Sequence, residues 1–379
     1  MVAKGFKNTE IGVIPEDWEV RSLGDLGKFS KGSGVRKDES LSGTIPCVRY
    51  GEIYTRHNDY IKRFYSFISS GISDTATKLR TGDILFAGSG ETKAEIGKSV
   101  AFIDNFEAYA GGDIVILSLK DIHALFVGYL LNAPFIQKQK ANRGQGDAVV
   151  HISANQLSDV KIPLPTLPEQ KAIAEALSDA DAWIANLEQL IAKKRLIKQG
   201  AMQQLLSPKE DWEVKKLEEV LDFGNGKDYK HLSSGDIPVY GTGGIMTYVN
   251  ESLYEGDSVG IGRKGTIDKP VFLQNKFWTV DTLFFTHTFR NVSPKYIFYQ
   301  FLLIPWKEYN EASGVPSLNK KTLEQIEITI PSLIEQTRIA NILTDMDIEI
   351  ESLENQLAKA RQIKQGMMQE LLTGRVRLV

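Results

Sequence analysis

Two stretches of the chain, each 40 residues long, are near copies of one another. Residues 167–206 read LPEQKAIAEALSDADAWIANLEQLIAKKRLIKQGAMQQLL, and residues 333–372 read LIEQTRIANILTDMDIEIESLENQLAKARQIKQGMMQELL. They align without a gap, and 22 of the 40 positions are identical. Internal repeats come first in reading a sequence, because they show how often one structural plan is used. This pair indicates a tandem repeat in which a segment of fixed length ends each copy.

Each copy of this segment predicts one long helix. Thr166 and Ser332, each followed three residues later by Glu, fit the capping box of a helix start. Apolar residues then recur at spacings of four and three, which is typical of a coiled coil. These seam positions are Ile173, Leu177, Ala180, Ile184, Leu187, Ile191 and then Lys194 in the first copy, and Ile339, Leu343, Met346, Ile350, Leu353, Leu357 and Ala360 in the second. Beyond Ala360 the spacing becomes three, four and four, through Ile363, Met367 and Leu371.

The two helices should pack against each other. At 1.5 Å per residue each would be about 60 Å long. Because a long segment separates them in the sequence, we expect an antiparallel pair. Gly200 and Gly366 occupy the same position in the two copies. A glycine inside a helix costs about 1 kcal/mol, so its presence in both predicts either a close helix approach or contact with a partner.

A segment of variable length precedes each helix. Asp17-Trp18-Glu19-Val20 recurs as Asp211-Trp212-Glu213-Val214, and the second copy is 28 residues shorter overall. Short β-type runs bounded by Gly and Asp, with one helix-like segment in each copy, predict β-rich α+β modules. The predicted fold class is therefore α+β: two such modules joined by two long antiparallel coiled-coil helices, with internal tandem pseudo-symmetry. The expected segments are residues 1–165, 166–207, 208–331 and 332–379.

Composition limits the function classes. The 379 residues are 42% hydrophobic and carry a net charge of −3, which excludes a strongly basic nucleic-acid binder as a description of the whole chain. The longest apolar run, Tyr296 to Trp306, is too short to cross a bilayer. One cysteine, Cys47, excludes an intrachain disulfide and a multi-cysteine zinc site. A reducing cytoplasm is the expected location.

Two glycine-rich stretches resemble catalytic or cofactor motifs only superficially. Gly97-Lys98-Ser99 lacks the earlier glycine of a phosphate-binding loop. Residues 260–265 fit Gly-x-Gly-x-x-Gly, but Pro270 follows where a helix should continue. We therefore expect no catalytic activity in this chain. A nucleotide-binding enzyme with degenerate motifs would instead bind ATP or a cofactor as an isolated chain.

One stretch has the character of a nucleic-acid contact. Residues 48–65 read VRYGEIYTRHNDYIKRFY, in which four basic residues stand against two acidic ones with aromatic residues between them. Arginine supplies paired hydrogen bonds to phosphate or guanine, and aromatic rings supply stacking area. The alternative is a strand pair with a solvated face. The matching residues 239–256 contain no Lys or Arg, which suggests that the two modules have different ligands.

The chain resembles the specificity subunit of Type I restriction–modification enzymes over essentially its whole length. Ile11-Gly12-x-Ile14-Pro15-x-x-Trp18 is similar to the opening motif of that family. The other matching motifs occur once in each copy: Pro163-x-Pro165 leading to Glu169-Gln170-x-x-Ile173, Ile330-Pro331 leading to Glu335-Gln336-x-x-Ile339, and Ile-Lys-Gln-Gly followed by Leu205-Leu206 or Leu371-Leu372. Two ordered copies with matching module lengths make the resemblance specific.

The resemblance implies a role in reading DNA. Each module would be a target recognition domain for one half of a bipartite, asymmetric site in double-stranded DNA. The helices would set the half-site spacing and dock two methyltransferase (modification) subunits, and motor–endonuclease (restriction) subunits would complete the complex. The chain would be non-catalytic and hold no cofactor, with S-adenosylmethionine, ATP and Mg on the partner subunits. No membrane is involved in this interpretation.

The expected DNA contacts are basic and aromatic side chains in both modules. A contrasting interpretation is a coiled-coil structural adaptor that binds protein partners through its β-rich modules. The candidates for DNA contact are Arg49, Tyr50, Arg56, Lys62, Arg63, Lys93 and Arg143 in the first module, and Tyr229, Lys230, Tyr240, Arg263, Lys264 and Lys320 in the second.

Overall fold

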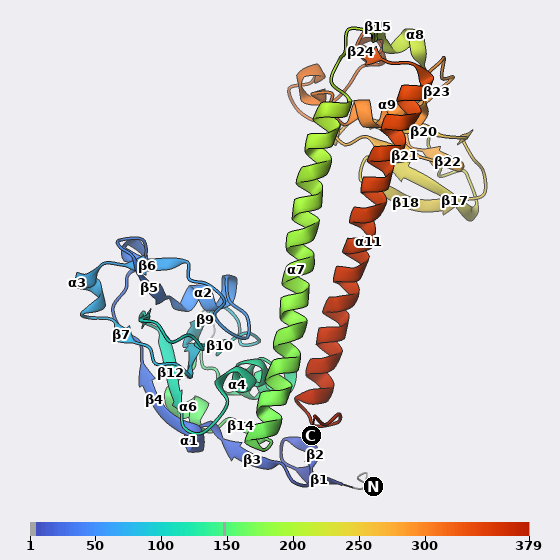
Figure 1. Ribbon diagram of the computed structural model, residues 1–379. Helices are drawn as coiled ribbons and strands as arrows, with labels where there is room; N and C mark the ends of the chain where they lie inside the picture. The colour runs from blue at the N-terminus through green and yellow to red at the C-terminus, as the bar shows by residue number, and fades with distance from the viewer. Residues whose placement is uncertain (1–4, 147–148, 379) are drawn as a thin grey trace. The chain divides into compact units, whose positions relative to one another are not determined.

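The computed structural model describes residues 5–146 and 149–378. Its contacts group the chain into two compact units (Figure 1). The first unit contains residues 1–186 and 357–379, and the second contains residues 187–356. Each unit therefore combines the module of one repeat with helix segments from both repeats. The four-segment division expected from the sequence stays a prediction.

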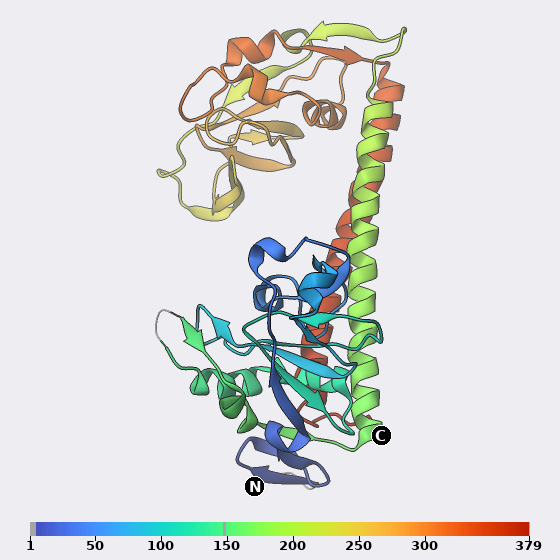
Figure 2. The same cartoon turned by 90° about the vertical axis from the view of Figure 1, so that its left-hand side faces the viewer.

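Two helices of 39 residues, α7 (Leu167–Leu205) and α11 (Leu333–Leu371), contribute to both units. In the first unit the start of α7 lies along the end of α11, and in the second the end of α7 lies along the start of α11 (Figure 1 and Figure 2). Ion pairs cross between them: Lys364 with Asp181 at 2.9 Å in the first unit, and Lys194 with Glu349 at 2.6 Å in the second. The expected antiparallel packing is confirmed within each unit.

Most predicted seam positions are buried or half-buried, and one is wrong. Ile363 is 42% exposed, and the next residue, Lys364, points inward instead. The reason is polar: Lys364 pairs there with the buried Asp181. The predicted close approach at Gly200 and Gly366 is also wrong, because a side-chain carbon added at either would have nothing within 4 Å.

The first module contains two four-stranded sheets, with strand orders β10-β8-β12-β4 and β6-β5-β11-β7. All neighbours are antiparallel except β5 and β11. The strands of the two sheets are β4 (Gly27–Lys31), β5 (Ile45–Val48), β6 (Ser66–Ile68), β7 (Thr77–Lys78), β8 (Asp83–Ala87), β10 (Ser99–Ala101), β11 (Tyr109–Ala110) and β12 (Ile114–Leu119).

Shorter elements complete the first module. Its helices are α1 (Leu23–Leu26), α2 (Tyr50–Thr55), α3 (Ser70–Ser73), α4 (Ala124–Leu131), α5 (Pro134–Arg143) and α6 (Ala154–Ser158), with a 3-10 turn at Lys37–Glu39. The remaining strands form three pairs: β1 (Phe6–Thr9) with β2 (Gly12–Pro15), β3 (Glu19–Ser22) with β14 (Lys161–Leu164), and β9 (Ser89–Gly90) with β13 (Val150–His151).

The second module repeats this topology, with sheets β16-β23-β20-β21 and β18-β17-β22-β19. Again one pair, β17 with β22, is parallel. The strands are β15 (Glu213–Lys216), β16 (Asp222–Asn225), β17 (Ser234–Gly241), β18 (Gly244–Val249), β19 (Tyr254–Glu255), β20 (Ser258–Gly262), β21 (Val271–Leu273), β22 (Lys276–Thr279), β23 (Leu283–His287) and β24 (Glu327–Ile330). The helices are α8 (Leu217–Val220), α9 (Pro294–Phe301) and α10 (Lys320–Glu324), with a 3-10 turn at Trp306–Tyr309.

In each module the strand that follows the repeated Asp-Trp motif pairs with the last strand. β3 pairs antiparallel with β14, and β15 pairs antiparallel with β24. Each module thus begins and ends at one place, directly before α7 or α11. The repeated Glu-Gln motif ties this place to the module. Gln170 accepts a hydrogen bond from the His123 amide at 3.0 Å, and Gln336 accepts one from the Ser293 amide at 2.8 Å. These amides belong to the residues that precede α4 and α9.

The predicted capping box is not completed by its glutamates. Glu169 instead accepts hydrogen bonds from the Trp18 indole, at 3.0 Å, and from Arg377. Glu335 accepts from Arg338 and Lys209. The glutamates therefore anchor other parts of the chain to the helix starts.

The basic stretch of residues 48–65 contributes to the length difference between the modules. In the first module, residues 49–65 connect β5 to β6 and include α2, whereas residues 242–243 alone connect β17 to β18. The stretch is therefore a helix-containing insertion, and the alternative of a strand pair is wrong. Within the described residues, no helix combines the length and the apolar character that crossing a membrane would need.

Candidate nucleic-acid interface

A hollow of about 690 Å³ lies on the first module where the β5–β6 insertion begins. The turn after β11 closes one side of it, since the Gly111 amide donates to Val48 O at 2.8 Å. Three of the predicted DNA contacts line it: Arg49, Tyr50 and Arg56. The other lining residues are Val35, Lys37, Ser40, Leu41, Gly51, Glu52, Thr55, Tyr65, Ser66, Gly112 and Asp113.

Arg49 is held in a fixed orientation at the start of α2. Its Nε donates to Ser66 Oγ at 3.2 Å, and its Nη2 lies 3.4 Å from Glu52 Oε1. Glu52 is buried and also accepts a hydrogen bond from Ser66. The carboxylate balances part of the guanidinium charge, so Arg49 offers a positioned donor rather than a mobile cation. Positioned donors suit recognition of a defined acceptor.

Two further arginines gather on one tyrosine ring. The guanidinium carbons of Arg56 and Arg63 lie 5.3 Å and 4.7 Å from the centre of the Tyr65 ring, and Arg63 Nε also donates to Tyr65 Oη at 2.7 Å. Both arginines are exposed, and Tyr50 beside them is 40% exposed. Stacked guanidinium groups next to exposed rings can contact both phosphates and bases.

The remaining candidates of the first module lie elsewhere. Lys62 pairs with Asp181 of α7 at 3.5 Å, and Lys93 is exposed between β9 and β10. Arg143, at the end of α5, donates to the carbonyl oxygens of Gln139 and Asp159, each at 3.0 Å. Sequence reasoning missed Lys37, which lines the hollow. The adjacent basic pair Arg36-Lys37 was the available signal.

In the second module, some candidates for DNA contact lie in an exposed turn, and others pack against the interior of the module. Arg263 and Lys264 follow β20 and are exposed, with their amides donating to Thr282 O at 2.8 Å and 3.2 Å. Lys230 is exposed, whereas Tyr229 and Tyr240 are half-buried and pack against apolar clusters. Lys320 Nζ donates to Phe223 O at 2.7 Å, so it stabilises the module.

The hollow and this turn border the same turn of the repeated topology, but they belong to different loops: Arg49 follows β5, whereas Arg263 follows β20, the counterpart of β8. In the first module the turn after β11 is bonded to the residues around Gly34 and Val48, with Gly112 N at 3.0 Å from Gly34 O. In the second module the turn after β22 is bonded to Tyr240 and Lys227, with Val280 N at 3.0 Å from Tyr240 O. We name this position the reading corner. The turn that defines each reading corner is equivalent in the two modules, whereas the candidate side chains that flank it come from different loops.

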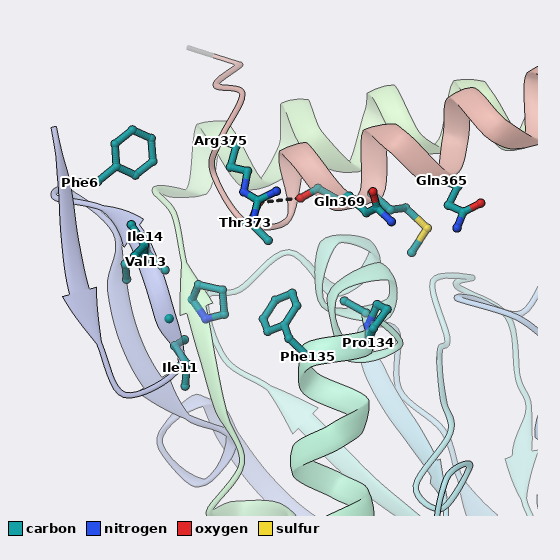
Figure 3. Close-up of a pocket in the computed structure, with 14 residues that line it drawn as sticks. Phe6, Ile11, Val13, Ile14, Pro134, Phe135, Gln365, Gln369, Thr373 and Arg375 are labelled. Atoms are coloured by element: carbon teal, nitrogen blue, oxygen red, sulfur yellow. Dashed lines mark hydrogen bonds between the residues drawn. The ribbon is translucent and has the colours of Figure 1, made fainter. Parts of the chain in front are cut away.

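A second concave surface in the first unit is apolar (Figure 3). This groove of about 600 Å³ lies between the β1–β2 hairpin, the start of α5 and the end of α11. Phe6, Val13, Ile14 and Phe135 supply its apolar lining, and Arg375 is the one charged residue among those that line it. A surface with so little positive charge is unsuited to a phosphate backbone.

The described part of the chain contains neither a cluster of metal-ligating side chains nor a reactive cysteine. Residues 5–146 and 149–378 contain no group of three or more His, Cys, Asp or Glu side chains placed to hold a metal ion. Burial raises the pKa of the Cys47 thiol to about 12, so this buried cysteine is not a reactive thiolate.

Comparison with known families decides the identity of the repeat. The domain described as Type I restriction modification DNA specificity domain matches residues 15–194 and again residues 209–362. The chain belongs to this family. Its two matches correspond to the two copies of the repeat. Members of the specificity family recognise DNA and are not themselves enzymes, so the predicted non-catalytic recognition role is confirmed.

Curated relatives agree along the whole length. The chain is 25% identical to the Type I restriction enzyme MjaVIII specificity subunit of Methanocaldococcus jannaschii, covering 99% of this chain and 96% of that protein. It is 28% identical to the putative type I restriction enzyme MjaX specificity subunit of the same organism, covering 99% and 97%. The predicted resemblance is therefore confirmed.

A solved structure supports the fold. The crystal structure of the S subunit of a Type I restriction–modification system from M. genitalium matches 98% of this chain and 97% of its own, with a TM-score of 0.68 and 18% sequence identity. The predicted fold class, two α+β modules with long helices, is confirmed. Membership of the specificity family also assigns the chain to a Type I restriction–modification complex.

Proposed function

We propose that each module reads one half of a bipartite DNA site through its reading corner. The observation that carries the proposal is the repeated corner itself. The two corners share one backbone plan, yet Arg49, Tyr50 and Arg56 stand at one and Arg263 and Lys264 at the other. An equivalent turn that is flanked in the two modules by different side chains, from different loops, is what two readers of different sequences require.

The helices are proposed as the spacer between the half-sites and as the docking surface for two methyltransferase subunits. Gly200 and Gly366 favour docking, because both face open space at a cost of about 1 kcal/mol each. The motor–endonuclease subunits would join this assembly. S-adenosylmethionine, ATP and Mg would be held by those partners, and the cytoplasmic location stays a prediction.

Exchange of one module tests the division of labour. Because β3 pairs with β14, residues 19–164 can be replaced by the matching module of a related subunit at one place. The exchanged subunit would be assembled with its methyltransferase subunits, and the methylated sites mapped by sequencing. One half-site should change while the other stays the same. A change in both half-sites would contradict independent readers.

Single substitutions test the reading corners. Arg56→Ala and Arg263→Ala should each weaken binding by about 1–3 kcal/mol, or roughly 5–150-fold, and relax the choice at one base pair. Lys193→Ala, an exposed position on α7, serves as the control. Unchanged affinity and unchanged sequence preference in both variants would refute the assignment of these corners.

Lengthening both helices tests the spacer. Four residues inserted after Asn186 in α7 and four after Gln356 in α11 add about 6 Å, at 1.5 Å per residue, and about 1.1 helical turns. This length is nearly two base pairs at about 3.4 Å each. The variant should keep both half-site sequences and prefer a site whose spacer is one or two base pairs longer. An unchanged spacer would show that the helices do not set the distance.

A further inference from the structure

A largely buried lysine links the first module to both long helices. Lys364 of α11 lies 3.1 Å from Asp59 of the module and 2.9 Å from Asp181 of α7, and its side chain is 16% exposed. Tyr129 of α4 donates to Asp181 at 2.8 Å, and its ring centre lies 5.2 Å from Lys364 Nζ. We call Tyr129, Asp181 and Lys364 the first clasp.

The second unit contains the same arrangement. Lys198 of α7 forms an ion pair with Asp347 of α11. Tyr299 of α9 donates to Asp347 at 2.8 Å, and its ring centre lies 5.6 Å from Lys198 Nζ. We call Tyr299, Asp347 and Lys198 the second clasp. Lys198 and Lys364 are the lysines of the repeated Ile-Lys-Gln-Gly motif, so an unexplained sequence motif acquires a structural role.

The clasps are crossed between the repeats. The first clasp holds the module of the first repeat with a lysine from the second repeat, Lys364. The second clasp holds the module of the second repeat with a lysine from the first repeat, Lys198. In each clasp the tyrosine belongs to the module and the aspartate to the helix that follows that module. Each clasp therefore joins three separate elements of its unit: a short helix of the module and both long helices.

The first clasp is electrostatically complete. Burial alone would lower the pKa of Lys364, but the charges and hydrogen bonds of Asp59 and Asp181 outweigh it and raise that pKa above its ordinary value. Burial, together with the hydrogen bond to Asp181, raises the pKa of Tyr129. The site is therefore filled by the protein's own charges. Without Lys364, Asp59 would lose its ion pair, and Asp181 would keep the longer pair with Lys62, at 3.5 Å, and the Tyr129 hydrogen bond.

The clasps supply what apolar packing in the units does not. The helix seams and modules share large apolar clusters, and apolar burial is non-directional. An ion pair combined with a tyrosine hydrogen bond requires particular atoms to meet, which specifies one orientation. α4 and α9 carry the tyrosines, and α4 packs against β8 and β10 while α9 packs against β20 and β21. Each clasp is therefore attached to a sheet of its module.

We propose that Lys364 and Lys198 are positioning residues that fix the orientation of a reading module on the helices, each for the module of the other repeat. The proposal rests on the proposed function in one respect, that each module reads one half-site. The positioning role predicts that a substitution of Lys364, near the end of the second repeat, affects recognition of the half-site read by the first module. A defect at Lys198 affects the half-site read by the second module.

The test uses the full chain and matched variants. Lys364→Gln and Lys198→Gln remove one lysine each, and Lys364→Arg and Lys198→Arg should restore function because the positive charge returns. Lys359→Gln and Lys193→Gln are the controls, since these exposed lysines also occupy equivalent positions in the two repeats. Tyr129→Phe and Tyr299→Phe remove only a hydroxyl, and they carry the test if the lysine variants fail to fold.

The first measurement is hydrogen exchange on the full chain without DNA. Lys364→Gln should speed amide exchange about tenfold or more in α4 and leave α9 unchanged. Lys198→Gln should do the reverse, and the tyrosine variants should show smaller changes in the same helices. Exchange that rises in the module of the same repeat as the lysine, or equally in both modules, would overturn the proposal.

The second measurement is DNA discrimination by the complex with the methyltransferase subunits. The wild-type site is first mapped by methylation sequencing, and competitor DNAs then carry one altered half-site each. Lys364→Gln should reduce discrimination about tenfold at the first module's half-site only, and Lys198→Gln at the other only. Equal loss at both half-sites would refute positioning. A wild-type site that is not bipartite would refute the proposed function, while the exchange experiment still decides whether the clasps hold the modules.

Discussion

The two units use one plan but join their helices to their modules differently. In the second unit, α7 continues through residues 206–212 directly into β15, and Lys209 lies 5.3 Å from the Trp212 ring and 3.3 Å from Glu335. In the first unit, the residues after α11 lie against those before β3, which are distant in sequence. There Arg377 binds Asp17 and the buried Glu169 and lies 5.8 Å from the Trp18 ring. Where the peptide chain does not make the connection, a stronger set of charged contacts does.

Arg377→Ala should have the largest effect on stability. Arg377 Nε lies 2.5 Å from Glu169 Oε1, and the Glu169 side chain is fully buried. Without Arg377, that carboxylate keeps only the Trp18 indole among its described partners. Removing one member of a buried ion pair costs roughly 3–5 kcal/mol, and we expect about 3 kcal/mol because Arg377 is partly exposed. Thermal unfolding should show the first unit melting about 6–12 °C lower.

Lys209→Ala is the matched change in the second unit. Lys209 and Glu335 are both partly exposed, so their ion pair should contribute less than about 1 kcal/mol. Amide hydrogen-exchange rates, measured separately in the two units, would show which unit has been destabilised. If Lys209→Ala destabilises its unit as much as Arg377→Ala destabilises the other, the contrast between the two junctions is wrong.

Lys140 should give the first unit a dependence on pH that the second lacks. Among the described lysines, only Lys140 is fully buried, with its Nζ donating to Gly97 O at 2.6 Å. Burial lowers the pKa of Lys140 from 10.5 to about 7. Between these values the unfolded chain binds more protons than the folded chain. The free energy of unfolding of the first unit should therefore rise with pH, by up to about 1.4 kcal/mol per pH unit.

The measurement compares wild type with Lys140→Met from pH 7 to 9.5, using hydrogen-exchange or denaturant transitions resolved by unit. The methionine variant should lose most of the slope and be more stable near pH 7, because no charge has to be buried. The second unit should show no such slope in either protein. A first-unit slope that survives in Lys140→Met would assign the pH dependence to another group.

Gly200→Ala and Gly366→Ala should act in opposite directions on the chain and on its complex. Alanine favours a helix over glycine by about 1 kcal/mol, and a side-chain carbon at either position meets nothing within 4 Å. Each change should therefore stabilise the isolated chain by up to about 1 kcal/mol. If a methyltransferase subunit packs closely there, its affinity should fall, as titration calorimetry would show. Unchanged affinity in both variants would count against docking at the glycines.

Lys62→Ala should have the smallest effect. Its 3.5 Å ion pair with Asp181 is half-exposed on the lysine side, so we expect a loss of less than about 1 kcal/mol that diminishes in high salt. The second unit offers a natural comparison, because the two residues that join β17 to β18 include no lysine. A drop of more than about tenfold in DNA affinity would restore Lys62 as a DNA contact, as the sequence suggested.

The long helices and the module plan were predictable because they depend on patterns within the sequence. The seam of Ile173, Leu177 and Leu187 follows from apolar spacing alone. Ile363 was mispredicted because spacing carries no information about Lys364, whose inward position depends on Asp59, about 300 residues earlier in the chain. Such pairs between distant residues determine the clasps and the Arg377 junction, and no local pattern encodes them.

The candidate interface was only partly predictable. The basic and aromatic composition of residues 48–65 drew attention to Arg49, Tyr50 and Arg56, which line one hollow. Composition could not separate them from Lys62, because the insertion turns back toward α7 after Tyr60 and directs Lys62 to Asp181. In the second module, Tyr240 is of a residue type common at interfaces, but its side chain packs against Phe277, with the ring centres 6.5 Å apart.

Each clasp takes its lysine from the helix of the other repeat, and this has a consequence for how such a gene could arise. A single repeat would carry a module, the aspartate of one clasp and the lysine of the other, so it could complete neither clasp alone. Two identical copies could complete both. On the proposed function, such a dimer of identical copies would bind a palindromic site, and gene duplication with fusion would let the two halves diverge. The two halves now differ by 28 residues in length and in the side chains of their reading corners, yet each half still supplies the lysine that completes the clasp of the other.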